Sequence, residues 1–285
     1  MSAPASPRVA FQGERGAFSE EAAFRLLGKH IEPVPRPTFD SLFAAIADGS
    51  ADLILAPAEN ALAGSVHRSH DLLLESNLTI IGEVVIPIAM HLIGPPGARW
   101  ENVRSAESHP VALAQCEGFL SAHPQIRRVV ADDTAGSVRN VVAAADITRA
   151  AIAGRRAAEF YGGVILREHL EDDRANFTRF LLLSPMAEIP RGANKLSLVL
   201  RLAHRPGSLH AALEPFAKRN INLLRIESRP IPGRPWEYRF YLDLAASTED
   251  GEVQIALEEM RKLGNEVRVL GCYVAAQTPE VNESP

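Results

Sequence analysis

The sequence predicts an α/β protein, with a two-lobed N-terminal part over residues 8–184 and a C-terminal βαββαβ, ferredoxin-like unit over 194–276. Three observations carry this prediction. Strand-like apolar runs alternate with helix-like segments in the first part, in two similar sets joined by long extended stretches. Prolines and a glycine at 185–193 interrupt the pattern and predict a linker. The two sets, the second at about 95–178, predict two lobes with a ligand cleft between them.

The first lobe is expected to start with a strand and to continue in β-α-(α)-β-α order. Hydroxyl side chains stand where its three helices would begin, and a hydroxyl there can accept a backbone hydrogen bond as an N-cap. These residues are Ser19, Thr38 and Ser65. The expected elements are strands at 8–12 and 52–56, helices at 19–27, from 39 onward and at 65–74, and a polar loop at 57–64.

The second lobe repeats the pattern after an extended stretch at 78–94, which two prolines and a glycine at 95–97 end. Ser108 is placed to cap the first helix of this lobe, whatever the function of the protein. The expected elements are helices at 108–120, 138–145 and 155–161, and strands at 127–130, 150–153, 164–166 and 180–183.

The C-terminal unit combines four strands with two helices. The expected elements are strands at 195–202, 223–228, 236–244 and 266–274, helices at 208–219 and 251–263, and a proline-rich loop before the third strand. This order is that of a ferredoxin-like unit.

Composition excludes several functional classes. Hydrophobic residues make up 46% and charged residues 23%, as in a globular protein with an ample core. The net charge of −5 disfavours a nucleic-acid partner. The longest apolar run, 84–93, is too short to cross a bilayer, and residues 1–7 lack the apolar segment of a signal peptide. Cys116 and Cys272 show no redox spacing, so a cytoplasmic location is expected.

Four polar segments follow predicted strands and could face one cleft. They contain Glu59 with Asn60, Ser108 with Gln115, Asp133 with Thr134, and residues 176–179. Each alone fits a turn or a helix cap, but together they predict a site. The helices expected to begin at Ser19, Ser65, Ser108 and Thr134 would aim N–H groups at this cleft, which suits carboxylates or phosphates.

Neither a nucleotide, a metal nor another cofactor is expected. No glycine-rich phosphate-binding motif follows a strand. His67 and His70 are three residues apart, and His109, Cys116 and His123 share one region, but neither set has a third ligand at a recognised spacing.

Several ordered motifs resemble those of prephenate dehydratases. They are PAEN at 57–60 with GSV at 64–66, SHP at 108–110 with AQC at 114–116, TAG at 134–136, and NFTRF at 176–180. The C-terminal part resembles the ACT domain of these enzymes, through RPGSL at 205–209, NL at 222–223 and ESRP at 227–230. The resemblance implies a two-lobed, periplasmic-binding-protein-like catalytic domain with an interlobe cleft, followed by an ACT regulatory domain. With no chorismate mutase segment before the catalytic part, a monofunctional enzyme is expected.

The reaction of the family is the decarboxylative dehydration of prephenate to phenylpyruvate. The resemblance implies that Thr178 donates a proton or a hydrogen bond to the leaving hydroxyl, polarised by Arg179 or by backbone donors. Asn60, Ser108 and Gln115 would orient the substrate. Further substrate contacts are implied for Ser19, Glu59, Thr134, Ala135, Gly136 and Phe180.

The resemblance also implies L-phenylalanine as an allosteric effector, bound at a subunit interface of a homodimer or homotetramer. The implied effector contacts are Gly207, Ser208, Leu209, Asn222, Leu223, Glu227, Ser228, Arg229 and Pro230.

Three positions depart from the pattern of the family. Ala61 stands where serine is frequent, and Val111 where glutamine is frequent, so neither position can be essential to an active enzyme. Ser208 replaces the alanine of the effector motif and leaves its selectivity open. Two alternatives remain: an arogenate dehydratase, whose substrate carries an amino group in place of the keto group, and a non-catalytic amino-acid-sensing module.

Overall fold

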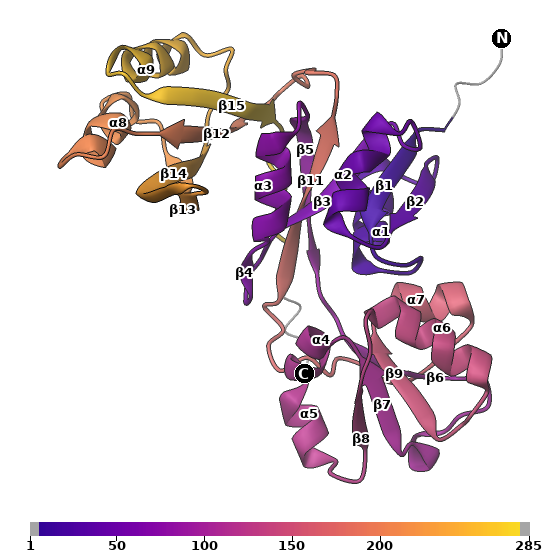
Figure 1. The fold of residues 1–285 in the computed structure, drawn as a ribbon. Helices are drawn as coiled ribbons and strands as arrows, with labels where there is room; N and C mark the ends of the chain where they lie inside the picture. Colours follow the sequence, from indigo (N-terminus) through magenta and orange to yellow (C-terminus); the bar gives the residue numbers. More distant parts are fainter. Residues whose placement is uncertain (1–5, 280–285) are drawn as a thin grey trace, which may run out of the picture. The chain divides into compact units, whose positions relative to one another are not determined.

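The computed structural model describes residues 6–279 and divides into two compact units (Figure 1). Of the described residues, 6–76, 84–181 and 277–279 form the first unit, and 77–83 and 182–276 form the second. Residues 1–5 lie outside the described part. No helix within 6–279 is long and apolar enough to span a membrane.

The first lobe is built on strands in the order β5-β11-β3-β1-β2, with β4 paired to β3. The strands are β1 (Arg8–Gln12), β2 (Glu32–Arg36), β3 (Leu53–Asn60), β4 (Gly64–Ser65), β5 (Thr79–Pro87) and β11 (Phe177–Ser184), and the helices are α1 (Phe18–Leu27), α2 (Phe39–Ala47) and α3 (His67–Glu75). β1 runs parallel to both β2 and β3. The predicted loop at 57–64 is wrong in its first half, because β3 continues to Asn60 and pairs with β4.

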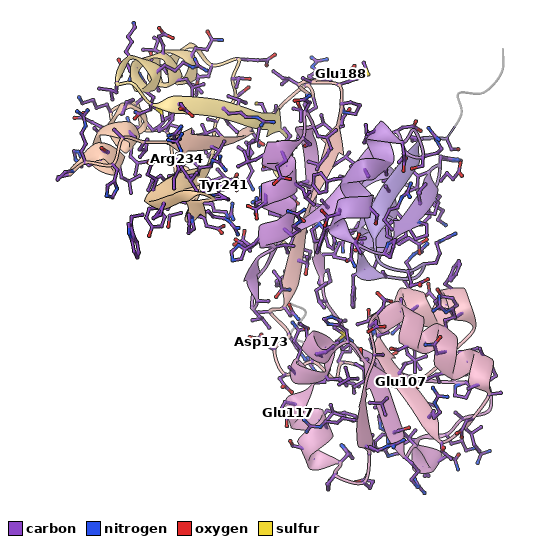
Figure 2. The ribbon with its side chains drawn as sticks, in the orientation of Figure 1. Glu107, Glu117, Asp173, Glu188, Arg234 and Tyr241 are labelled. Carbon is purple, nitrogen blue, oxygen red and sulfur yellow. The ribbon has the colours of Figure 1, made fainter. Side chains whose placement is uncertain are left out.

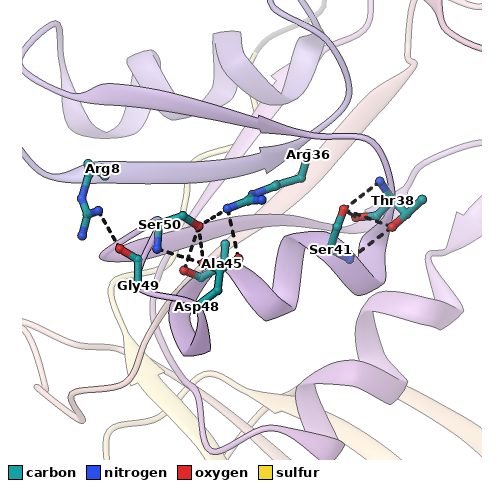
Figure 3. A network of polar contacts seen from close by, with 8 residues as sticks. All are labelled: Arg8, Arg36, Thr38, Ser41, Ala45, Asp48, Gly49 and Ser50. Carbon is teal, nitrogen blue, oxygen red and sulfur yellow. Dashed lines mark hydrogen bonds and ion pairs between the residues drawn. The ribbon is translucent and has the colours of Figure 1, made fainter.

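A network of polar contacts closes the end of α2 (Figure 3). Ser50 donates through its backbone to Asp48 Oδ1 at 2.9 Å, and Arg8 Nη1 donates to the carbonyl of Gly49 at 2.6 Å. At the other end, the predicted cap is confirmed: Thr38 accepts from Ser41 N at 3.1 Å and forms a capping box with it. These contacts fix the turns at both ends of α2. None of them involves the carboxyl end of β3.

The other predicted hydroxyl caps are wrong. Ser19 lies inside α1, whose N-cap is Ala17, and Ser65 lies in β4 before α3. Asp133 rather than Thr134 caps its helix, with Oδ1 accepting from Gly136 N at 2.6 Å. A carboxylate offers a charged acceptor to the helix N-terminus and therefore outcompetes a hydroxyl one residue later.

The second lobe has a five-stranded sheet in the order β10-β6-β9-β7-β8. Helices α6 and α7 lie on one side of it, and α4 and α5 on the other (Figure 1). The strands are β6 (His91–Gly94), β7 (Ser105–Ser108), β8 (Arg127–Val130), β9 (Arg149–Ala153) and β10 (Val164–Arg167), and the helices are α4 (Pro110–Ala114), α5 (Glu117–Ala122), α6 (Thr134–Ala144) and α7 (Arg155–Tyr161), with a 3₁₀ turn at Trp100–Asn102. The single helix predicted at 108–120 is therefore two helices, and Ser108 ends β7 instead of capping α4, whose N-cap is His109.

Two extended crossovers join the lobes, as predicted. One leads from β5 to β6, and the other leads from β10 back to β11. They are hydrogen-bonded to each other, because Leu170 N donates to Met90 O and Ile88 N donates to Asn176 O, both at 2.8 Å. The residues at which the chain passes between lobes are thus tied together.

The second unit is the predicted βαββαβ fold. Its antiparallel strands lie in the order β13-β14-β12-β15, and α8 and α9 share a hydrophobic core with them. The elements are β12 (Lys195–Arg201), α8 (Ser208–Ala217), β13 (Leu223–Ile231), β14 (Arg234–Leu244), α9 (Gly251–Lys262) and β15 (Glu266–Tyr273). The proline-rich loop predicted before β14 shrinks to a two-residue turn. Gly271 of β15 pairs in parallel with Ile80 at the start of β5.

Candidate functional site

Asn60 and Thr178 meet at the end of β3, where β3 lies beside β11. Asn60 Nδ2 donates to Thr178 Oγ1 at 3.0 Å, to Asn176 Oδ1 at 2.7 Å and to the Phe177 carbonyl at 3.1 Å. Thr178 is only 8% exposed. The fold therefore joins two predicted site residues that are 118 positions apart in the sequence.

Both the nitrogen and the oxygen of the Asn60 carboxamide are hydrogen-bonded to other groups of the protein. Its oxygen accepts from Leu62 N at 3.1 Å and from Ala63 N at 2.8 Å. Asn60 was expected to orient the substrate, but its nitrogen and oxygen here hold protein groups. Because Thr178 Oγ1 accepts the Asn60 N–H, its own hydroxyl proton points elsewhere, and no acceptor for it occurs among residues 6–279.

Arg179 points away from Thr178, because side chains alternate between the faces of a strand. The burial of β11 follows this alternation: Thr178 and Phe180 are buried, whereas Phe177 and Arg179 are half-buried. Arg179 Nη1 lies 4.0 Å from Oε2 of Glu59, the residue that precedes Asn60 in β3. Asn60, and not Arg179, is therefore the residue that is hydrogen-bonded to Thr178 Oγ1 in the described chain.

Ser108 and Gln115 belong to the second lobe and make other contacts. Ser108 is fully buried, and its hydroxyl donates to the Ile152 carbonyl at 2.6 Å, which ties β7 to β9. Gln115 is half-buried at the end of α4, and its backbone carbonyl accepts from Asp172 N at 2.8 Å. Neither residue is hydrogen-bonded to Asn60 or Thr178 in the described chain.

The start of α6 already carries a protein carboxylate. Thr134 is half-buried and Ala135 is buried, while Asp133 accepts the Gly136 N–H. Because Asp133 places its charge at this helix end, the end is less suited to the carboxylate of a substrate than expected.

Glu20 is a residue that the sequence reasoning missed. Its side chain is fully buried and accepts from Arg15 Nε, from Gly16 N at 2.8 Å and, from the second lobe, from Arg156 Nε at 2.8 Å. Ser19, predicted to contact substrate, precedes it in α1 and is 7% exposed. No local signal marks Glu20, since Arg156 lies 136 positions away.

Two other reactive side chains are shielded. Burial, and then the charges of Glu171 and Asp172, raise the pKa of the Cys116 thiol to about 12, so it is no nucleophile near neutral pH. Burial also lowers the pKa of His91, whose Nδ1 accepts from His169 N at 3.3 Å. No cluster of three metal-ligating side chains occurs among residues 6–279.

Two of the predicted effector residues line a small cavity of about 130 Å³ in the second unit. Ser208 and Leu209 line it from the start of α8, and Tyr238 and Phe240 line it from β14. Ser228 and Pro230 of β13 pair with Phe240 and Tyr238 in register, next to this wall. The remaining lining residues are Leu202, Ala203, His204 and Arg205.

The other expected effector contacts do not line this cavity. Gly207 is the N-cap of α8, and the carbonyl of Asn222, which precedes β13, accepts from Ala245 N at 2.9 Å. Leu223 packs against the core, and Glu227 forms an ion pair with Arg225 on the same strand. Arg234 and Tyr241, both labelled in Figure 2, belong to the neighbouring strand β14.

The family models and a curated relative indicate one family. A family model described as prephenate dehydratase matches residues 9–188, and one described as ACT domain matches residues 197–265. "Arogenate dehydratase/prephenate dehydratase 2, chloroplastic" of Arabidopsis thaliana is 41% identical over 278 residues, which cover 93% of this chain and 72% of that protein.

Two solved structures are similar along almost the whole chain, each with a TM-score of 0.85. One is a prephenate dehydratase from Arthrobacter aurescens in complex with L-Phe, 30% identical, covering 97% of this chain and 93% of that chain. The other is GqqA, described as a novel type of quorum quenching acylase, 34% identical, covering 94% and 98%. With its motifs, fold and relatives in agreement, this chain belongs to the prephenate dehydratase family, lyases of aromatic amino-acid biosynthesis, and carries an ACT domain.

Proposed function

We propose that the protein is a prephenate dehydratase, which converts prephenate to phenylpyruvate, carbon dioxide and water. One observation carries the catalytic assignment. The Thr178 oxygen accepts a hydrogen bond from Asn60, while its hydroxyl proton has no acceptor among residues 6–279. The proton is thus free for a substrate oxygen.

The reaction breaks two bonds that join the substrate ring to its substituents. The bond from the ring to its carboxylate breaks and carbon dioxide leaves, and its electron pair completes the aromatic ring while the hydroxyl at the opposite carbon departs. A proton must reach the departing hydroxyl to give water. Thr178 donates to that oxygen, and the Asn60 N–H at its own oxygen stabilises the negative charge that develops there.

The other assignments follow the contacts. Ser108 is fully buried and bonded to Ile152 O, so we assign it to supporting the lobe. Gln115 stays a substrate-orienting candidate. Arg179 stays the candidate partner of a substrate carboxylate, because guanidinium and carboxylate suit each other in geometry and charge.

A direct assay tests this function. Wild-type protein should form phenylpyruvate from prephenate. Thr178→Ala should lower kcat by about 10²–10⁴-fold, the usual worth of general acid assistance, and Thr178→Ser should keep much of it. A folded Thr178→Ala variant with near-normal turnover would refute the assignment.

Arogenate is the alternative substrate, because the Arabidopsis relative is named for both reactions. The two substrates differ only in the side chain, where an amino group replaces the keto group. Measuring kcat/KM for prephenate and for arogenate with the same protein preparation decides which is the better substrate. A higher value with arogenate would reverse our choice.

We further propose that L-phenylalanine regulates the enzyme from the second unit. Support comes from the cavity beside Ser208 and Leu209 and from the relative solved in complex with L-Phe. Couplings between sites are typically about 1–3 kcal/mol, so L-phenylalanine should change the apparent substrate affinity about 5–150-fold. D-Phenylalanine is the control, and equal activity with and without the L-isomer would contradict regulation.

A further inference from the structure

Asn176 stands at the junction where the returning crossover enters β11. Its side chain is 1% exposed. Its backbone carbonyl accepts from Ile88 N of the other crossover at 2.8 Å, and its side-chain Oδ1 accepts from Asn60 Nδ2 at 2.7 Å. One residue thus ties the crossovers together and holds the partner of Thr178.

The orientation of both carboxamides is fixed by their partners. Asn60 Oδ1 accepts from the backbone N–H groups of Leu62 and Ala63, so the nitrogen of Asn60 must face Asn176 and Thr178. Asn176 must then present its oxygen to Asn60. Turning either amide over would set two donors or two acceptors against each other.

This orientation is maintained at an energetic cost. With its oxygen committed to Asn60, Asn176 leaves Nδ2 buried and without an acceptor among residues 6–279. A buried donor without a partner destabilises the folded state, and such groups are rare in native proteins. An apolar residue such as leucine could fill the same space without this cost.

We propose that Asn176 is a positioning residue for the dehydration. The Asn60 nitrogen has two hydrogens but three acceptors within reach: Asn176 Oδ1, Phe177 O and Thr178 Oγ1. By accepting one hydrogen at the shortest distance, Asn176 directs the other toward Thr178 and its neighbouring carbonyl. The Thr178 proton is thereby aimed at the leaving hydroxyl of the substrate.

Without Asn176 Oδ1, the carboxamide of Asn60 loses one of its fixed partners and can rotate away from Thr178. The hydroxyl of Thr178 then samples other orientations. Misplacement of a catalytic group by about 1 Å can cost about 100-fold in rate. The effect should fall on kcat, because Asn176 holds the catalytic hydroxyl rather than the substrate.

A double-mutant cycle tests this role, which rests on the proposed function of Thr178. Asn176→Ala should lower kcat by about 10–100-fold and leave KM within about threefold. In the Thr178→Ala background the same change should lower kcat less than about twofold, because the group that Asn176 positions is gone. A merely structural role would give additive losses.

The control removes a buried polar group elsewhere in the same unit. The hydroxyl of Ser69 in α3 is likewise buried without a partner, and Ser69→Ala should keep kcat. If Asn176→Ala fails to fold, Asn176→Leu, which keeps a similar side-chain size but offers no acceptor to Asn60, enters the cycle under the same criterion.

The outcomes separate the two proposals. Additive losses, or normal kcat in Asn176→Ala, would overturn the role of Asn176 alone, provided that Thr178→Ala is impaired. A Thr178→Ala variant with normal kcat would overturn the proposed function and this inference with it.

Discussion

The role that we propose for Thr178, a very weak acid, depends on where the fold places its hydroxyl. An isolated threonine hydroxyl holds its proton tightly, but a donor at its oxygen stabilises the charge that forms as the proton leaves. Asn60 Nδ2 is such a donor to Thr178 Oγ1, and we propose that Asn176 orients it. The proposed chemistry of Thr178 therefore depends on a neighbour more than one hundred positions away.

The contribution of Glu20 to the stability of the fold likewise depends on a residue far away in the sequence, Arg156. Its carboxylate is fully buried against Arg15, Arg156 and a backbone N–H. Glu20→Ala should cost about 3 kcal/mol or more, because two arginines lose their shared partner. We expect the Tm to fall by roughly 6 °C or more. Glu75→Gln, at an exposed residue, should change the Tm by only about 1 °C, and an equal shift would contradict the argument.

At the scale of elements, strands β2 and β7 escaped prediction for opposite reasons. β2 contains Pro33 and Pro35, which disfavour a central strand. Among the described strands, however, β2 lies at the edge of its sheet and pairs with β1 alone (Figure 1). β7 looks polar, yet all four of its residues are buried. Its Glu107, labelled in Figure 2, lies 2.7 Å from Arg149 Nη2 of β9, so a distant partner makes its burial possible.

The turn between β1 and α1 is predicted to be sensitive to a single methyl group. Gly16 has a φ of +83°, and an added Cβ would lie 2.8 Å from the Ala157 Cα. Gly49 has a similar φ of +71°, but a Cβ added there would have no atom of the described residues within 4 Å beyond its own chain neighbours. Gly49→Ala should cost about 1 kcal/mol for its backbone conformation alone. Gly16→Ala should lower the Tm at least twice as much, and equal shifts would show that this contact can relax.

His91, the first residue of β6, should make stability depend on pH. Burial, then the charges of Arg155 and His169, lower the pKa of His91, and Glu168 and Glu171 oppose the shift. The stabilisation is complete above the unfolded pKa of about 6.5, and is lost as the pH falls below it, because the unfolded chain then binds the proton more readily. The Tm should therefore fall as the pH is lowered from 7 to 5.

A single substitution isolates that contribution. In His91→Asn, the amide oxygen can replace Nδ1 as acceptor for the backbone N–H of His169, but the side chain no longer titrates. The decrease in Tm toward pH 5 should be smaller than in the wild type. His30→Asn, at an exposed histidine, should keep the wild-type pH dependence. An unchanged slope in His91→Asn would refute the assignment.

At the scale of the whole molecule, the second unit offers a surface for the expected self-association. Leu224 and Ile226 are 48% and 43% exposed on β13, which ends its sheet. An apolar, unpaired edge strand of this kind favours pairing with another chain.

Mutating that surface tests the expected homodimer or homotetramer. Ile226→Glu should lower the molar mass measured by light scattering, because a charge would be buried in the interface. Ile255→Glu, on an equally exposed residue of α9, should leave it unchanged. A wild-type mass equal to that of the monomer would contradict the expected assembly.

The sequence by itself determined the two-lobed α/β part, the βαββαβ unit and the residues worth testing. Local periodicity, prolines and glycines carry that information, and the motifs resemble one family over nearly the whole chain. Only the tertiary structure decided that Asp133 rather than Thr134 caps α6, that Glu20 is buried between two arginines, and that Asn60 holds Thr178. Each of these depends on which atoms compete for one donor or one charge. Distances in the folded chain decide which group makes the contact. The competing groups either lie far apart in the sequence or, when adjacent, differ only in local geometry, so the sequence alone cannot rank them.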